Sequence, residues 1–262
     1  MKHQGVGPYL LVGLILLCGC GGRDGTSPPP QFADIAGNWQ FTLTSASAGS
    51  NPSTLAGSIH QSSGSISGAV HIGGSSCFDA LSTVDLTGTL TGSNIQLTST
   101  SVSGQVATIT GTTSDSGFTG TFNILGGCAD GEHGSITGNK VPFVSGTVNG
   151  TFTPASGQGF DVVAQVAEGS ASSAGTFGLT GTVTFASGCL SSGTIESGSF
   201  PGGSFLLGTS MVLEIGTNNG NLTFEGTVDQ FTGEISGNYK ISGGSCDHSG
   251  TAVLIVSDPW GY

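Results

Sequence analysis

The chain has 262 residues, and glycine (48), serine (37) and threonine (31) make up about 44% of them. It carries 16 acidic residues against four Lys and Arg, and this excess of negative charge excludes a phosphate-binding surface and therefore a nucleic-acid partner. Disordered chains combine low hydrophobicity with high charge. Here 35% of the residues are hydrophobic and 8% are charged, which predicts a folded protein. The low content of charged residues also leaves few side chains suited to catalysis.

The N-terminus has the features of an export signal. Lys2 provides a positive charge, and residues 9–17 form an apolar run of nine residues. A bilayer-spanning helix needs about 20 apolar residues, so this run is too short to be a mature membrane span. We therefore expect residues 1–19 to act as a signal peptide.

The end of this segment, Leu17-Cys18-Gly19-Cys20, resembles the lipobox of bacterial lipoproteins, in which a Leu and two small residues precede the lipidated Cys. The resemblance implies cleavage before Cys20, acylation of Cys20 and anchoring in a membrane, for which several acyl chains give stable attachment. In that family an Asp after the Cys favours the inner membrane. Gly21 stands there, so we expect the outer membrane of a bacterial envelope, on its periplasmic or surface side. Ordinary secretion with a free Cys is the alternative.

Residues 20–33 are rich in Gly and Pro and are expected to form a flexible tether. Two similar segments follow, which we place at residues 34–143 and 144–258, with a tail at 259–262. The duplication is visible in GSSCF (74–78) and ASGCL (186–190), and in GFTGTFNILGGC (117–128) and FTGEISGNYKISGGSC (231–246). Matched Cys spacings argue against chance similarity between Gly-rich segments.

Both copies have apolar residues at every second position, which is typical of strands with one buried side. Trp39, Phe41 and Leu43 share one phase, and Phe177, Leu179 and Val183 do so in the second copy. No helical period follows the signal. About eight short strands fit each copy, separated by turn residues.

A five-residue motif recurs in these strands. Its first and last residues are apolar, and its central residue is Gly. It is seen in LTGTL (86–90), FTGTF (118–122), LTGTV (179–183) and FEGTV (224–228). Since the Gly shares the inward phase, it favours strongly bent strands that close a small barrel. We therefore predict an all-β fold of two tandem antiparallel up-and-down barrels. A β-sandwich, a flat open sheet and a solenoid are the alternatives.

The order of these strands, together with Gly37-x-Trp39, resembles the calycin barrels, both avidin-like and lipocalin-like. The resemblance implies that Trp39 lies at the start of the first strand and closes the barrel base. The second copy has Val148 at the corresponding place. Trp260 is the only other tryptophan, so the aromatic cage of biotin-binding relatives is missing and biotin binding is not inferred.

Four cysteines remain after export and lipidation, and an even set in an exported chain indicates disulfides. In an up-and-down barrel Cys77 would follow the third strand and Cys128 the seventh, so both would lie at one end. The same holds approximately in the second copy. We predict the pairs Cys77–Cys128 and Cys189–Cys246.

Acidic and histidine residues follow the second cysteine of each copy, and they are the loop-site candidates of the chain: Asp130, Glu132, His133, Asp247 and His248. Zinc is the competing interpretation, but paired Cys would not ligate a metal and the usual ligand spacings are missing. We predict no metal, no cofactor and no catalytic residues, since no nucleophile motif, phosphate loop or pair of inward acids is present.

These observations predict a non-catalytic binding or surface-interaction module anchored in the envelope. Its partners would be the membrane, through the lipid, and a small apolar or sugar-like ligand or an envelope protein. The alternative is a purely structural surface protein with filled barrels, and an enzyme is the least favoured class.

Overall fold

The computed structural model describes residues 32–47, 53–79, 82–198 and 200–259, and every helix or strand in these ranges is a β-strand. The predicted signal peptide, Cys20 and most of the predicted tether lie outside the described residues. No helix among the described residues is long and apolar enough to cross a membrane.

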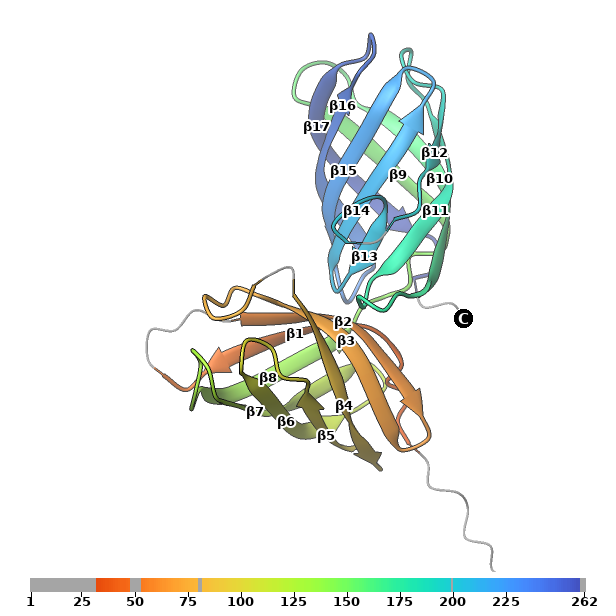
Figure 1. Ribbon diagram of the computed structural model, residues 1–262. Coiled ribbons are helices and arrows are strands. Elements are labelled where there is room, and N and C mark those ends of the chain that lie inside the picture. Colours follow the sequence, from red (N-terminus) through yellow and green to blue (C-terminus); the bar gives the residue numbers. More distant parts are fainter. Residues whose placement is uncertain (1–31, 48–52, 80–81, 199, 260–262) are drawn as a thin grey trace, which may run out of the picture. The chain divides into compact units, whose positions relative to one another are not determined.

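The first eight strands form one closed barrel, in which each strand is antiparallel to the next and β1 pairs with β8 (Figure 1). Their bounds are β1 Gly37–Ser45, β2 Ser53–Ser62, β3 Ser65–Gly73, β4 Thr83–Thr91, β5 Asn94–Ser99, β6 Val106–Thr113, β7 Gly117–Leu125 and β8 His133–Lys140. This is barrel 1, and it confirms the predicted up-and-down order.

The remaining strands form barrel 2, which closes through pairing of β10 with β11. Their bounds are β9 Gly146–Pro154, β10 Phe160–Ala171, β11 Phe177–Phe185, β12 Ser192–Ile195, β13 Phe205–Leu207, β14 Ser210–Thr217, β15 Gly220–Val228, β16 Glu234–Ser242 and β17 His248–Val256. The short strands β12 and β13 both pair with β11 and β14, so together they occupy one strand position. Barrel 2 therefore also has eight positions, and closure of both sheets rules out the sandwich, the open sheet and the solenoid.

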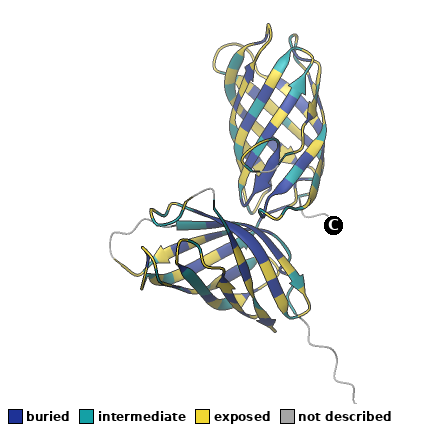
Figure 2. Ribbon diagram, viewed as in Figure 1, coloured by how far each residue is buried: buried dark blue, intermediate teal, exposed yellow. Residues whose placement is uncertain are grey.

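Buried and exposed residues alternate along the strands of both barrels (Figure 2). Phe41, Leu86 and Phe118 point into barrel 1, and Phe152, Leu179 and Phe224 point into barrel 2. Each interior is a separate apolar cluster, and removal of this surface from water is the main force that stabilises each barrel.

Inward glycines let the strands approach closely where the barrel wall bends. Gly111 on β6 lies opposite Gly120 on β7, and a Cβ atom on Gly120 would collide with the carbonyl oxygen of Thr110. The ring of Phe118 fills the space that both missing side chains leave: its Cζ lies 2.7 Å and 2.9 Å from the Cβ positions of Gly111 and Gly120. In FTGTF and FEGTV the Gly is thus a bend whose inward space is taken by the ring of the Phe two residues earlier, whereas Gly88 and Gly181 lie directly against the backbone of the neighbouring strand.

The two predicted disulfides are confirmed. Cys77 follows β3 and bonds to Cys128 after β7, and Cys189 follows β11 and bonds to Cys246 after β16. The Cα–Cα distances are 5.6 Å and 5.9 Å. Since the loops they close span 51 and 57 residues, each bond contributes about 4 kcal/mol in the chain-entropy description.

The segment that enters barrel 2 is held by a half-buried carboxylate. The backbone N–H of Val144 donates to Oε2 of Glu168 at 2.8 Å, and the N–H of Glu168 donates to Oγ of Ser145 at 2.9 Å. Burial raises the pKa of Glu168 to about 7, although the hydrogen bond from Val144 acts in the opposite direction. The folded state therefore binds this proton more tightly than the unfolded chain does.

This raised pKa predicts how stability depends on pH. The contribution of Glu168 is fully present below the unfolded pKa of about 4.5 and is lost as the pH rises through about 7. We expect the melting temperature to fall between pH 5 and pH 8, and Glu168→Gln to remove that part of the fall and to melt higher than wild type at pH 8. Glu225→Gln, on the exposed side of β15, is the control. Equal pH slopes for wild type and Glu168→Gln would contradict this assignment.

Candidate functional site

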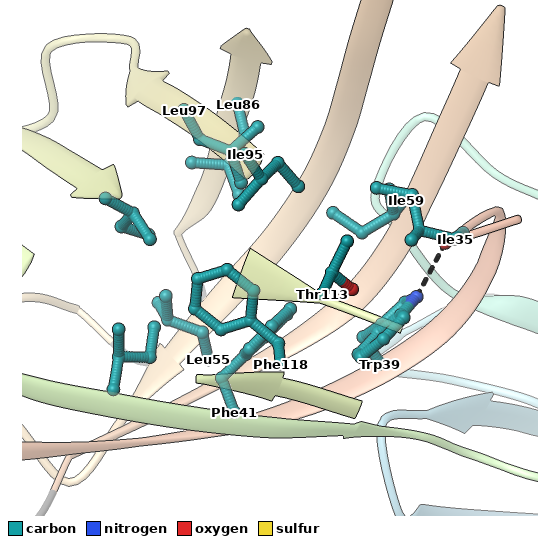
Figure 3. Close-up of a pocket in the computed structure, with 12 residues that line it drawn as sticks. Ile35, Trp39, Phe41, Leu55, Ile59, Leu86, Ile95, Leu97, Thr113 and Phe118 are labelled. Atoms are coloured by element: carbon teal, nitrogen blue, oxygen red, sulfur yellow. Dashed lines mark hydrogen bonds between the residues drawn. The ribbon is translucent and has the colours of Figure 1, made fainter. Parts of the chain in front are cut away.

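The interior of barrel 1 holds one small cavity of about 20 Å³ (Figure 3). Only one of its twelve lining residues is polar, and that residue, Thr113, donates its hydroxyl hydrogen bond to a neighbouring backbone carbonyl. Because a single water needs about 10–15 Å³ by this kind of measure, the cavity has no room for a ligand of drug or sugar size. The lining residues are Ile35, Trp39, Phe41, Leu55, Ile59, Leu86, Ile95, Leu97, Ile109, Thr113, Phe118 and Ile136.

Trp39 fills one end of this interior. It is the third residue of β1 and is 2% exposed, and its ring stacks on Phe41 with centroids 5.5 Å apart. Its indole N–H donates to the carbonyl oxygen of Ile35 at 2.7 Å, so the one polar atom of the ring is satisfied (Figure 3). Trp39 therefore lies near the start of β1 with its ring buried in the interior of barrel 1.

The opposite end of barrel 1, which we call the disulfide end, carries an open polar depression of about 550 Å³. Hydroxyl and carboxylate groups predominate among its side chains, and no Lys or Arg lines it. The residues are Ser45, Ser47, Ser53, Gly74, Ser75, Ser76, Cys77, Cys128, Ala129, Asp130, Gly131 and Glu132. We call it the end depression. Its groups can accept hydrogen bonds from the hydroxyl or amino groups of a polar ligand.

A buried amide holds two loops of the disulfide end together beside the disulfide. Gln105 is 1% exposed; its Nε2 donates to the carbonyl oxygen of Cys77 and its Oε1 accepts from the N–H of Ala129, both at 3.0 Å. The loops after β3 and β7, which carry nine of the twelve lining residues, are thus joined twice, by the Cys77–Cys128 bond and by this amide. Gln105 is absent from the residues predicted as functional, because a lone Gln before a strand carries no sequence signal.

The loop candidates of barrel 1 divide between two surfaces. Asp130 and Glu132 line the end depression, and Oδ1 of Asp130 also accepts from the N–H of Gly126 at 2.6 Å. His133 is exposed and faces a different hollow on the outer side of the barrel, with its Nδ1 3.0 Å from the carbonyl oxygen of Gly131. The three adjacent candidates therefore do not form one cluster.

Barrel 2 uses its corresponding residues for local structure. Oδ1 of Asp247 accepts from the N–H of Gly244 at 3.2 Å, and Nδ1 of His248 lies 3.1 Å from the hydroxyl of Tyr239. Burial raises the pKa of Tyr239. The amide of Asn219 lies 3.3 Å from the carbonyl oxygen of Cys189, as Gln105 does with Cys77 in barrel 1. Among the described residues, no three His, Cys, Asp or Glu side chains come together as a set that could hold a metal ion.

Neither the models of known protein families nor the curated proteins contain a match for this chain.

The filled interior makes a prediction about Trp39. Trp39→Ala should lower the free energy of unfolding by about 3–5 kcal/mol, because it removes a buried ring and leaves a cavity. Phe231, which is 75% exposed, provides the control: Phe231→Ala should change it by less than about 0.5 kcal/mol. Urea unfolding measures both values, and a loss below about 1 kcal/mol for Trp39→Ala would contradict its role in the barrel core.

Proposed function

We propose that the chain is a lipid-anchored, non-catalytic interaction module of the bacterial envelope, which meets a polar ligand or envelope protein at the disulfide end of barrel 1. One contrast carries the proposal. The interior of barrel 1 leaves about 20 Å³ of apolar space, whereas its disulfide end opens into about 550 Å³ of polar space. Recognition on the outside of a filled barrel is favoured over enclosure of a ligand within it.

The chemistry of the end depression favours a partner rich in hydroxyl or amino groups. Its five serine hydroxyls each offer one donor and two acceptor positions, and the Glu132 carboxylate accepts hydrogen bonds more strongly than a neutral oxygen does. The disulfide and the Gln105 amide preorganise the two loops that carry Ser75, Ser76 and Glu132, which lowers the entropy lost on binding.

The second candidate function is purely structural. It is supported by the local use of the loop acids, since Asp130 and Asp247 both accept from backbone N–H groups of their own loops. In that case the loops would serve only to close the barrel ends.

Native mass spectrometry of the full lipidated chain from its own envelope distinguishes the two functions. The interaction module predicts a reproducible adduct, which Glu132→Gln weakens roughly tenfold by removing a charged acceptor. Glu225→Gln, on the outer side of barrel 2, should leave the adduct unchanged. Absence of an adduct from the wild-type protein would favour the structural role, and equal loss in both variants would exclude the end depression as the site.

The lipid anchor has its own test, because two cysteines lie close together in the lipobox-like segment. Cys20→Ser should abolish acylation and release the protein from the membrane fraction, whereas Cys18→Ser should keep both properties. Labelling with a fatty acid analogue and the intact mass of the mature chain measure the outcome. Label retained by Cys20→Ser, or lost from Cys18→Ser, would refute attachment at Cys20.

A further inference from the structure

Hydroxyl and amide side chains predominate on the outer side of β5–β8 in barrel 1, where Val106, Leu125 and His133 are the other side chains and all three lie toward the disulfide end. We call these residues the hydroxyl face: Asn94, Gln96, Thr98, Thr108, Thr110, Thr112, Thr119, Thr121, Asn123, Ser135, Thr137 and Asn139. All twelve are exposed or half-buried. None is charged, although the described residues include every acidic residue of the chain except Asp24.

The side chains of the hydroxyl face form rows that cross the strands. One row joins Asn94, Thr112, Thr119 and Thr137, and the next joins Gln96, Thr110, Thr121 and Ser135. Neighbouring strands lie about 4.8 Å apart and alternate residues about 6.7 Å apart, so the hydroxyls form a regular lattice.

The hydroxyls of this lattice keep free hydrogen-bonding capacity. Thr110 Oγ1 and Thr121 Oγ1 are 3.2 Å apart and share one hydrogen bond. That bond uses one donor and one acceptor, so the pair still offers a donor and several acceptor positions to the outside. Thr is β-branched and stiff at χ1, so each methyl and hydroxyl is held in place before binding.

Two hollows lie along β7 and β8 on this side of the barrel. One, of about 610 Å³, is lined by Thr112, Thr119, Thr137 and Asn139 among others. The other, of about 620 Å³, is lined by Thr121, Asn123 and Ser135 together with His133, and it shares Ser45 with the end depression. The hydroxyl face is therefore an indented surface along which an extended polar chain can lie.

Barrel 2 provides an internal comparison, since β14–β17 occupy the same four strand positions. Its outer side there carries Glu214, Glu225, Glu234 and Lys240 together with the exposed Val253 and Ile255. The shared fold therefore does not require an uncharged hydroxyl surface, and its presence in barrel 1 calls for a reason beyond β-propensity.

We propose that the hydroxyl face binds a neutral polysaccharide chain. Sugar rings display hydroxyls beside C–H groups, and threonine displays a hydroxyl beside a methyl. The sugar hydroxyls can therefore hydrogen-bond to the threonine hydroxyls while the C–H groups pack against the methyls. An uncharged face has no electrostatic partner for an anionic polymer. The closed barrel curves this face around its axis and the two hollows indent it, so a flexible chain that follows the curve makes more contacts than a flat rigid surface does.

Affinity electrophoresis of the full chain in detergent micelles tests this proposal, with gels that contain dextran, hydroxyethyl cellulose or laminarin as neutral probes and alginate as an anionic probe. We expect at least one neutral probe to retard the protein while alginate does not. The face variant carries four changes: Thr110→Val, Thr112→Val, Thr119→Val and Thr121→Val. It should bind the retarding probe at least roughly tenfold more weakly, because valine keeps the shape and removes the hydroxyl.

The matched control removes four exposed hydroxyls from barrel 2, by Thr182→Val, Thr184→Val, Thr227→Val and Thr251→Val, and should bind as wild type does. Thr121→Glu is a second, more soluble face variant, and Thr227→Glu is its control. Melting curves establish that each variant is folded. No retardation by any neutral probe, stronger retardation by alginate, or equal loss in face and control variants would overturn the proposal. Because the hydroxyl face does not include the end depression, Glu132→Gln should leave the retardation unchanged.

Discussion

Two glycines facing each other across β6 and β7, with the ring of Phe118 over both, show the constraint on which the barrels depend. An eight-strand barrel is narrow, so its strands must bend strongly, and at Gly120 a Cβ atom would strike the neighbouring backbone. The glycine permits the bend and the ring fills the space. Phe41 does the same over Gly138, and Phe224 over Gly226 in barrel 2. The glycine-and-ring arrangement that closes the wall therefore also fills the interior, which in barrel 1 leaves a cavity of about 20 Å³.

The two copies keep what stabilises the barrel and differ in what they present to solvent. Each has a disulfide between the loops that follow its third and seventh strand positions, and an amide, Gln105 or Asn219, directly before its sixth that bonds to the first half-cystine. Loss of any of these would leave a buried polar group unpaired or a long loop unconstrained. Substitution of an outward residue carries no such penalty, so barrel 2 has Glu and Lys side chains at strand positions where hydroxyl and amide side chains predominate in barrel 1.

The sequence was sufficient for the strands, the closed barrels and both disulfides, because period-two burial and strand parity are local rules that the inward residues obey. The sequence was insufficient for features that depend on the conformation of the loops. The position of β4 is filled in barrel 2 by the separate strands β12 and β13, and no alternation in residues 196–204 signals that interruption. Asp130, Glu132 and His133 are neighbours in the chain, yet His133 is the first residue of β8 and faces the outer side of the barrel, whereas the two acids before it line the end depression. The hydroxyl face was not predicted, because the alternating pattern shows only that the outward residues of each strand are polar and not which strands lie side by side.

A lattice of near-identical hydroxyls has a thermodynamic consequence for a repeating ligand. The pair Thr112 and Thr119 and the pair Thr110 and Thr121 lie two residues apart along the same two strands. A ligand that moves from one pair to the other therefore meets almost the same surroundings. A polymer with equivalent units can therefore bind in many registers of similar energy, and each additional register raises the observed affinity without any stronger contact. Barrel 2 lacks this degeneracy, because Glu225 beside Asn238 and Ile255 beside Glu234 make every register different. Weak, exchangeable hydrogen bonds hold a single small molecule poorly on an open surface, whereas a polymer that leaves one register is still close enough to bind in the next before it dissociates.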